Sequence, residues 1–346
     1  MDMGKNTRPI FLWLLIIYLL VCAMVTVGGI TRLTRSGLSI VEWRPITGIL
    51  PPLNQKEWEE EFQKYRKFPE YKKVNRRMNL AEFKNIFFWE YVHRLLGRVI
   101  GLLVLLPFLY FLIRKRLDKT LIRRVVILFV LGGLQGLMGW YMVKSGLVNM
   151  PRVSHYRLAA HLLIAFAILS YLIWMMTELA TGRPVRLARV RSHPVFRHVG
   201  VLIVLLFVQI IYGAFTAGLR AGSMFNTFPL MGSGLVPPGI FGLQPFLANF
   251  TENPATVQFI HRVLAWILLF YTGAFTVYAY PRIHSQTGKI ALFLLSGGVL
   301  LQFLVGVMTL LAAAPPGLGA LHQTIAALLW SAVFFLAFRL EAKSPE

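Results

Sequence analysis

Eight apolar runs, each long enough to cross a lipid bilayer, constrain this chain more than any other feature. A helix of roughly 20 residues spans the hydrocarbon layer, at about 1.5 Å per residue. The runs lie near residues 9–30, 86–113, 121–143, 155–178, 198–219, 254–280, 288–311 and 316–340. Because lipid offers no partner to unpaired backbone groups, each run is expected to be helical. The predicted fold class is an all-α membrane protein with eight transmembrane helices.

The Lys and Arg residues between these runs predict how the chain is oriented. They number thirteen in three alternate loops, 114–124, 179–197 and 281–289, but only three in the loops 144–154, 220–253 and 312–315. Cytoplasmic loops carry the excess of basic residues, so both termini are expected in the cytoplasm, beneath the inner (plasma) membrane. The clusters account for the net charge of +22 without a nucleic-acid partner. The single cysteine, Cys22, excludes an intramolecular disulfide.

The first external loop, residues 31–85, differs because it carries many charges of both signs. An apolar stripe at helical spacing within it consists of Trp58, Phe62 and Tyr65. This stripe predicts an amphipathic helix over 54–67 that lies on the outer membrane surface. Asn79 followed by Glu82 is typical of a helix N-terminal cap, so the second span is expected to begin as an external extension. A solvated linker without contact to any site is the alternative.

The sequence also repeats itself. Three residues of the first run recur 185 positions later, as Gly28 and Gly213, Thr31 and Thr216, Arg35 and Arg220. Three residues of the third run recur 167 positions later, as Leu134 and Leu301, Gln135 and Gln302, Gly139 and Gly306. Each half holds four spans, so both halves enter the membrane in one direction and a twofold axis along its normal is expected. The prediction is two four-helix bundles, an N-half of residues 1–180 and a C-half of residues 190–346.

Four histidines lie inside the spans, namely His93, His161, His261 and His322. Each lies six or seven residues from the external start of its run, about 10 Å below the surface. Such side chains are costly at membrane depth and indicate a functional site. His93 with His161, and His261 with His322, provide two imidazoles per half, which is too few for zinc but matches the axial ligands of a haem iron. A histidine hydrogen-bonded between helices is the structural alternative.

The two halves differ beside these histidines. Glu90 precedes His93 by three residues, whereas Gln258 holds that position before His261. Because positions three apart share a helix face, Glu90 is expected to approach the same ligand as His93 and to donate or accept protons there. An ion pair with a neighbouring arginine that serves packing alone is the alternative.

Arg94 and Arg262 directly follow two of the histidines. A guanidinium group pairs well with carboxylates, so both arginines are candidate cofactor-binding residues that hold haem propionates. Extension of these long side chains to lipid headgroups is the alternative.

Longer motifs resemble the haem A synthase family across nearly the whole chain. They are GGITRLTRSGLSIVEWRPITGILPPL, FFWEYVHRLLGR, VKSGL with RLAAHL, FNTFPLMG, NFTENPATVQFIHR and LGALHQTIA. The resemblance implies oxidation of the C8 methyl of haem O to a formyl group, which gives haem A for terminal oxidases. It implies that His93 and His161 hold the substrate haem O or product haem A, that His261 and His322 hold a haem b, and that Glu90 is catalytic. Some bacterial members carry a cysteine pair in an external loop. This chain lacks that pair and is closer to the subgroup with a long first loop, which includes the mitochondrial enzymes.

The resemblance also implies haem O synthase and an electron donor as partners. It does not identify the donor, and it does not decide whether the chain forms a homo-oligomer. An iron with two axial histidines has no position for oxygen. Either one imidazole leaves during turnover, or electrons are removed and water supplies the oxygen.

Two other functions use the same features: a quinol-oxidising di-haem b-type electron-transfer protein, and a transporter without cofactor. Haem A in the extracted pigment would distinguish a haem A-forming enzyme from the electron-transfer protein. A colourless purified protein would favour the transporter.

Overall fold

The computed structural model describes residues 7–43, 47–146, 153–182, 184–185 and 193–340. Eight helices in these segments are long and apolar enough to cross a membrane. They are α1 (Thr7–Leu33), α4 (Leu80–Ile113), α5 (Lys119–Gly146), α6 (His155–Thr181), α8 (Phe196–Gly218), α10 (Pro254–Ala279), α11 (Gln286–Leu311) and α12 (Pro316–Arg339). No β-strand occurs in the described residues, apart from one isolated bridge. The predicted all-α class and the eight spans are confirmed.

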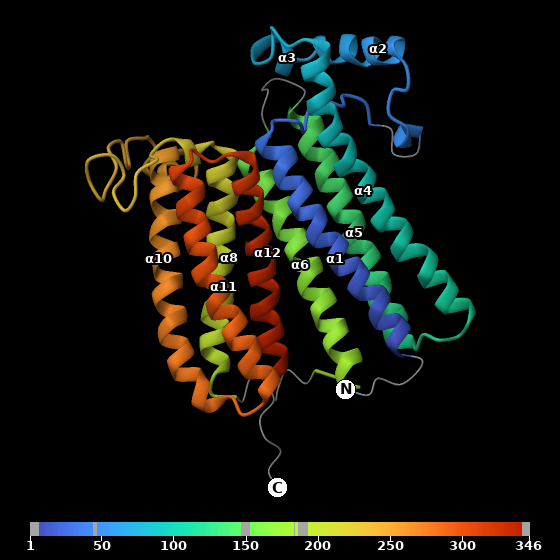
Figure 1. Cartoon of the computed structure of the whole chain (residues 1–346), viewed down its shortest axis with the longest axis vertical. Helices are drawn as coiled ribbons and strands as arrows, with labels where there is room; N and C mark the ends of the chain where they lie inside the picture. Colours follow the sequence, from blue (N-terminus) through green and yellow to red (C-terminus); the bar gives the residue numbers. More distant parts are fainter. Residues whose placement is uncertain (1–6, 44–46, 147–152, 183, 186–192, 341–346) are drawn as a thin grey trace.

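The helices form two adjacent groups that are each continuous in sequence (Figure 1). The N-half contains α1, α4, α5 and α6, and the C-half contains α8, α10, α11 and α12. The groups meet through contacts of α1 with α12, α6 with α12 and α6 with α8. In the most apolar window of α1, α6 and α12, 39% of residues are buried, against 11% in α4 and 17% in α5. Helices α1, α6 and α12 are therefore the most central spans, and α4 and α5 present most of their apolar side chains outward.

Hydrogen bonds as well as apolar contacts join the two groups. The Gln323 side chain of α12 donates to the carbonyl of Val25 in α1 at 2.9 Å. The indole N–H of Trp330 in α12 donates to the carbonyl of Phe166 in α6, also at 2.9 Å. Buried polar side chains in a bilayer need such partners, because lipid supplies none.

Above the N-half, the first external loop folds into a small cap (Figure 1). The cap consists of α2 (Gln55–Arg66) and α3 (Pro69–Lys73), and it packs on the first turns of α4. The apolar stripe of α2 packs on two aromatic rings of α4. Trp58, Phe62 and Tyr65 all contact Phe83, and Trp58 also contacts Phe87. The ring centroids in these contacts are 5.0–6.5 Å apart. The amphipathic helix is confirmed, but its predicted placement on the membrane surface is wrong. Its apolar face is buried against protein, with Tyr65 and Phe83 fully buried.

The start of α4 explains why the cap stands clear of the bundle. Asn79 accepts a hydrogen bond from the Glu82 backbone N–H at 3.0 Å, and Glu82 accepts one from the Asn79 backbone N–H at 2.8 Å. This reciprocal pair fixes the helix start. With 34 residues, α4 is about 50 Å long, more than a bilayer's hydrocarbon thickness. The predicted external extension is confirmed.

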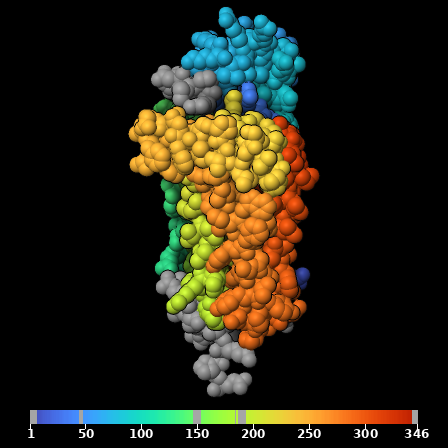
Figure 2. Space-filling model, turned by 90° about the vertical axis from the view of Figure 1, so that its left-hand side faces the viewer, coloured from blue at the N-terminus to red at the C-terminus, as the bar shows by residue number. Residues whose placement is uncertain are grey.

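The segment between α8 and α10 covers the same end of the C-half (Figure 2). It contains the short helices η2 (Ala221–Ser223), η3 (Phe246–Ala248) and α9 (Asn249–Glu252). Two further short helices lie elsewhere, η1 (Thr47–Ile49) and η4 (Tyr280–Arg282). The Asn253 side chain accepts a hydrogen bond from the backbone N–H of Ala255 at 3.0 Å and so begins α10. Each half therefore has polypeptide over its cap-side end.

Candidate functional site

The four predicted histidines lie toward the cap-side ends of four different helices. They are His93 on α4, His161 on α6, His261 on α10 and His322 on α12. The last three lie about two turns into their helices, whereas His93 lies about four turns in, because α4 starts inside the cap. The helices thus bring together, in each half, two imidazoles that are far apart in sequence.

Each histidine ring lies against a glycine of a neighbouring helix. A Cβ atom built on the glycine would approach the ring within 2.9–3.3 Å, in the pairs Gly28 with His93, Gly139 with His161, Gly213 with His261 and Gly306 with His322. Any larger residue would push the imidazole away. These are the glycines that the sequence repeats 185 and 167 positions apart. Their repetition therefore has a direct cause in the packing of the histidines.

Three of the four imidazoles also have a glutamine partner. The amide nitrogen of Gln135 lies 3.3 Å from Nε2 of His161, that of Gln302 lies 3.3 Å from His322, and that of Gln209 lies 3.4 Å from His261. In each of these rings Nδ1 is buried and has no hydrogen-bond partner. An amide nitrogen can only donate a hydrogen bond, so in this arrangement Nε2 accepts it and the ring proton lies on Nδ1. A metal ligand would need the amide to turn its oxygen toward the ring instead, and in all three glutamines that oxygen is buried without a hydrogen-bond partner. The repeated Gln135 and Gln302 were visible in the sequence, but Gln209 was missed.

The separation of the imidazoles suits an iron between them. The ring centroids of His261 and His322 lie 6.5 Å apart. A metal bound about 2 Å from a nitrogen of each ring places the two ring centres roughly 6 Å apart. His93 lies within electrostatic range of His161, although no ring contact joins these two in the described part of the chain. No cluster of three or more His, Cys, Asp or Glu occurs among the described residues. Each pair therefore offers two protein ligands, and the donor set fits an axial haem pair.

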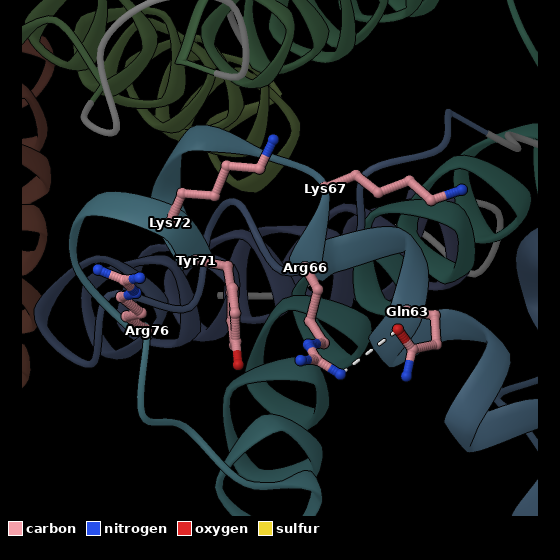
Figure 3. Close-up of a pocket in the computed structure, with 6 residues that line it drawn as sticks. All are labelled: Gln63, Arg66, Lys67, Tyr71, Lys72 and Arg76. Atoms are coloured by element: carbon pink, nitrogen blue, oxygen red, sulfur yellow. Dashed lines mark hydrogen bonds between the residues drawn. The ribbon is translucent and has the colours of Figure 1, made fainter.

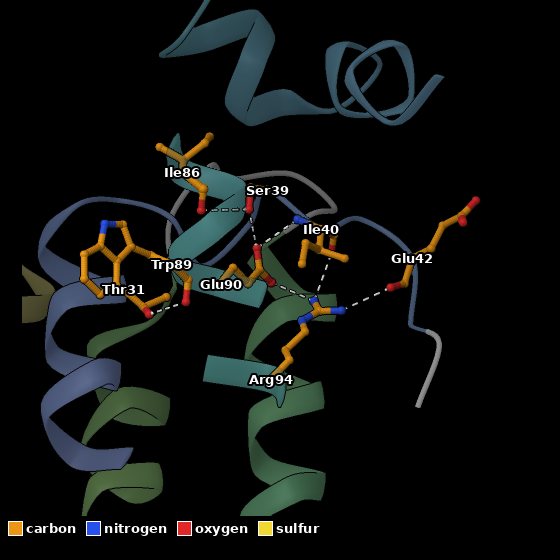
Figure 4. Close-up of polar contacts among 8 residues, drawn as sticks. All are labelled: Thr31, Ser39, Ile40, Glu42, Ile86, Trp89, Glu90 and Arg94. Carbon is orange, nitrogen blue, oxygen red and sulfur yellow. Dashed lines mark hydrogen bonds and ion pairs between the residues drawn. The ribbon is translucent and has the colours of Figure 1, made fainter. Parts of the chain in front are cut away.

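Glu90 is buried, with 2% of its surface exposed, and both carboxylate oxygens are bonded (Figure 4). One oxygen accepts hydrogen bonds from the Ser39 hydroxyl at 2.7 Å and the Ile40 backbone N–H at 2.8 Å. The other forms an ion pair with Arg94 at 2.7 Å. Glu90 therefore ties the segment after α1 to α4, directly beside the turn that carries His93. Its catalytic role stays a prediction.

Arg94 and Arg262 bind backbone carbonyls in both halves. Arg94 donates to the carbonyls of Ile40 and Glu42 at 2.9 and 3.1 Å. Arg262 donates to the carbonyls of Phe225 and Thr227 at 2.6 and 2.8 Å, and these residues lie 185 positions after Ile40 and Glu42. The repeat thus extends to single hydrogen bonds that fix the segment after α1 or α8. The propionate-binding role of the two arginines stays a prediction, and this anchoring role was not anticipated.

The cap carries a separate basic hollow (Figure 3). Its volume is about 480 Å³, and its lining residues are Gln63, Arg66, Lys67, Tyr71, Lys72 and Arg76. Arg66 stacks over the rings of Phe62 and Tyr71, at 5.8 and 5.4 Å from their centroids. The hollow lies on α2, α3 and the turn before α4, on residues that do not include the histidines.

Fold and site together define a multi-span membrane protein with two pairs of partly buried imidazoles, each ring packed against a helix glycine. The model of the cytochrome oxidase assembly protein family, COX15-CtaA, matches residues 11–334. The chain belongs to this family.

Relatives match over nearly the full length of both chains. A protein of Nitrosomonas eutropha is 47% identical over 97% of this chain and 95% of its own. One of Nitrosospira multiformis is 47% identical over 96% of this chain and 94% of its own. One of the Wolbachia of Brugia malayi is 43% identical over 96% of this chain and 98% of its own. All three are named heme A synthase.

Proposed function

We propose that this chain is a haem A synthase, an oxidoreductase that converts the C8 methyl of haem O to a formyl group and so supplies haem A to terminal oxidases. The observation that carries this is the name shared by relatives up to 47% identical over nearly the whole chain. The site agrees with it, because two pairs of partly buried imidazoles are suited to two haems.

The N-half pair, His93 and His161, would hold haem O as substrate, and the C-half pair, His261 and His322, would hold a resident haem b. When bound, haem b supplies reversible one-electron chemistry beside the substrate site. The support for this assignment is the buried carboxylate of Glu90, because the C-half has the uncharged Gln258 at that position. This difference favours the N-half as the half in which the methyl group is oxidised.

Glu90 would serve the reaction through charge and protons. Oxidising a methyl group to a formyl group releases protons as well as electrons, so the site needs an acceptor. A buried carboxylate also favours positive charge that develops nearby, and its fixed hydrogen bonds keep it in place at no further cost. Ser39, Ile40 and Arg94 orient the group, and the segment they form excludes water from that side.

The orientation in the membrane follows from the loop charges. The cap and the histidines share one end of the bundle, and the basic loops 114–124 and 281–289 lie at the other (Figure 1). We assign the basic end to the cytoplasm, with both termini there, and the haem sites to the external side of the plasma membrane. Haem O synthase would deliver the substrate, and a separate electron donor or acceptor would exchange electrons at haem b.

The test is expression with haem O synthase in a host that makes no haem A, followed by extraction of the pigments. Haem A is expected only when this chain is present. A purified chain that binds haem in both halves but leaves haem O unchanged would overturn the proposal in favour of electron transfer alone. A control without the chain shows whether the host forms any haem A itself.

A further inference from the structure

A cluster of three aromatic rings joins the outer helices of the C-half beside its histidine site. Trp266 of α10 contacts Phe303 of α11, with 4.6 Å between ring centroids. Phe228, in the segment that covers this half, stacks on Trp266 at 5.8 Å and contacts Phe303 at 6.0 Å. Phe303 lies one helical turn before Gly306, the glycine that packs against His322. The three-ring cluster therefore fastens α10 to α11 close to a candidate haem ligand.

The repeat places different residues at these three positions in the N-half. Counting back by 168, 167 and 185 residues gives Arg98 on α4, Gly136 on α5 and Trp43 after α1. Trp43 is half exposed, and the guanidinium of Arg94 lies over its ring at 5.5 Å. A Cβ built on Gly136 meets no heavy atom of the described residues within 4 Å, so this glycine does not serve close helix packing. The N-half therefore has no counterpart of the three-ring cluster.

In the described part of the chain, aromatic rings join α4 to α5 only near the end away from the cap. Phe108 and Phe129 make this contact, with 5.8 Å between ring centroids. Pro107 has no backbone N–H, so the Leu103 carbonyl lacks its usual partner in the helix and accepts the Trp13 indole N–H at 2.7 Å. A proline is a usual place for a helix to bend. The cap-side part of α4 is thus fastened to α5 less firmly than α10 is to α11.

The seam between the cap-side parts of α4 and α5 faces the bilayer and borders the N-half site. Helix α4 lies at the outer edge of the N-half (Figure 1). In the most apolar windows of α4 and α5, 11% and 17% of residues are buried, against 22% and 28% in α10 and α11. Gly136 lies one helical turn before Gly139, against which the His161 ring packs. A molecule dissolved in lipid would therefore meet the N-half site from the side.

We propose that the lipophilic substrate haem enters the N-half sideways from the bilayer, through the seam between α4 and α5, and that the product leaves by the same route. Haem O carries a long apolar chain and so partitions into lipid rather than water. The missing side chain at Gly136 leaves room for a flat ring system, whereas Trp266 and Phe303 fill the corresponding room in the C-half. One half thus exchanges its ligand with the membrane and the other retains it. This inference rests on the proposed function for the identity of the N-half ligand.

The test is the transfer of haem to added apomyoglobin from the purified full chain, held in lipid nanodiscs and loaded in both halves. Two phases of one haem each are expected, and His322→Ala, which keeps the N-half haem, should show the fast phase alone. Gly136→Phe copies the C-half residue into an open space and should slow the fast phase at least about 10-fold. The matched control Leu137→Phe adds the same ring at a neighbouring, exposed position, and the rate should not change.

A reverse variant keeps the test decisive if Gly136→Phe does not hold haem. Phe303→Gly removes one ring of the cluster and should speed the slow phase at least about 10-fold. A fast phase that Gly136→Phe leaves unchanged, or a slow phase that Phe303→Gly leaves unchanged, would overturn the inference. Haem A formation together with such unchanged rates would contradict this inference alone. A chain that shows the expected exchange but makes no haem A would contradict the proposed function alone.

Discussion

The N-half and the C-half share several contacts and differ in others. Both hold a histidine pair against glycines, and both use an arginine to bind the carbonyls of the segment after their first helix. One difference lies three residues before a histidine, where the N-half has Glu90 and the C-half has Gln258. Another is Gln209, which lies beside His261, whereas the position 185 residues earlier is Met24.

This comparison shows how one fold can hold two similar groups for different purposes. The shared features set where a ligand lies and how much room it has. At one of these positions the N-half has a carboxylate and the C-half an uncharged amide. We infer that chemistry was separated from electron transfer by side-chain replacement alone. The predictions below test that separation, from the largest expected effect to the smallest.

The largest expected effect is the loss of the C-half haem when one of its two histidine ligands is removed. His322→Ala leaves a single imidazole in that half, and one axial ligand holds haem poorly. We expect bound haem to fall to about half in the purified protein, with the N-half spectrum retained. The measurement is haem per protein by pigment extraction. An unchanged haem content would show that the C-half pair is not a haem site.

Replacing the Glu90 carboxylate by an amide gives the N-half the same residue type that the C-half has at Gln258. Glu90→Gln keeps the size of the side chain but removes its charge and its basicity. We expect haem to remain bound while haem A formation falls about 100-fold or more, the usual effect of losing an acid–base group. Gln258→Glu is the matched control, for which no loss of haem A is expected. Full haem A formation by Glu90→Gln would remove this residue from the mechanism.

Replacing the glycine beside a histidine ring by alanine tests how closely that ring is packed in each half. Gly306→Ala would place a methyl group 2.9 Å from His322, whereas Gly139→Ala would place one 3.3 Å from His161. Overpacking typically costs about 1–3 kcal/mol, so we expect a larger loss of thermal stability and haem retention in Gly306→Ala. Melting temperatures of the two variants measure it, and equal temperatures would contradict the difference.

The cap over the N-half should show the smallest effect, as a dependence of its stability on pH. Burial raises the pKa of Glu70 in α3 to about 7, and the charge of Glu90 adds to this shift. The folded cap therefore binds a proton that the unfolded segment releases near pH 4.5. Stability from this proton is present below that pH and is lost as the pH rises through about 7.

Glu70→Gln should remove that dependence and stabilise the cap above pH 7. The fluorescence of Trp58, which packs on Phe87 of α4 at 5.0 Å between ring centroids, reports unfolding of the cap. The same pH profile in the variant and the unchanged chain would show that another group is responsible. Because the C-half has no equivalent of the cap, haem retention by His261 and His322 should be the same in both.

Some features of the fold and site were predictable because they are local. A run of apolar residues and a capping pair such as Asn79 and Glu82 carry their own signal. The placement of α2 was not predictable, since an apolar stripe looks the same whether it faces lipid or Phe83. The use of Arg94 was likewise hidden, because its carbonyl partners lie more than fifty residues earlier in the chain.

The sequence by itself determined the eight spans, the four histidines within them and the replacement of Glu90 by Gln258, since each depends on the type and order of residues along one helix. Only the tertiary structure decided which helix faces each imidazole. That choice places Gln209 beside His261 and sets Gly28 against His93. The physical reason is that a hydrogen bond between helices depends on which faces pack together, and a linear order of residues does not specify those faces.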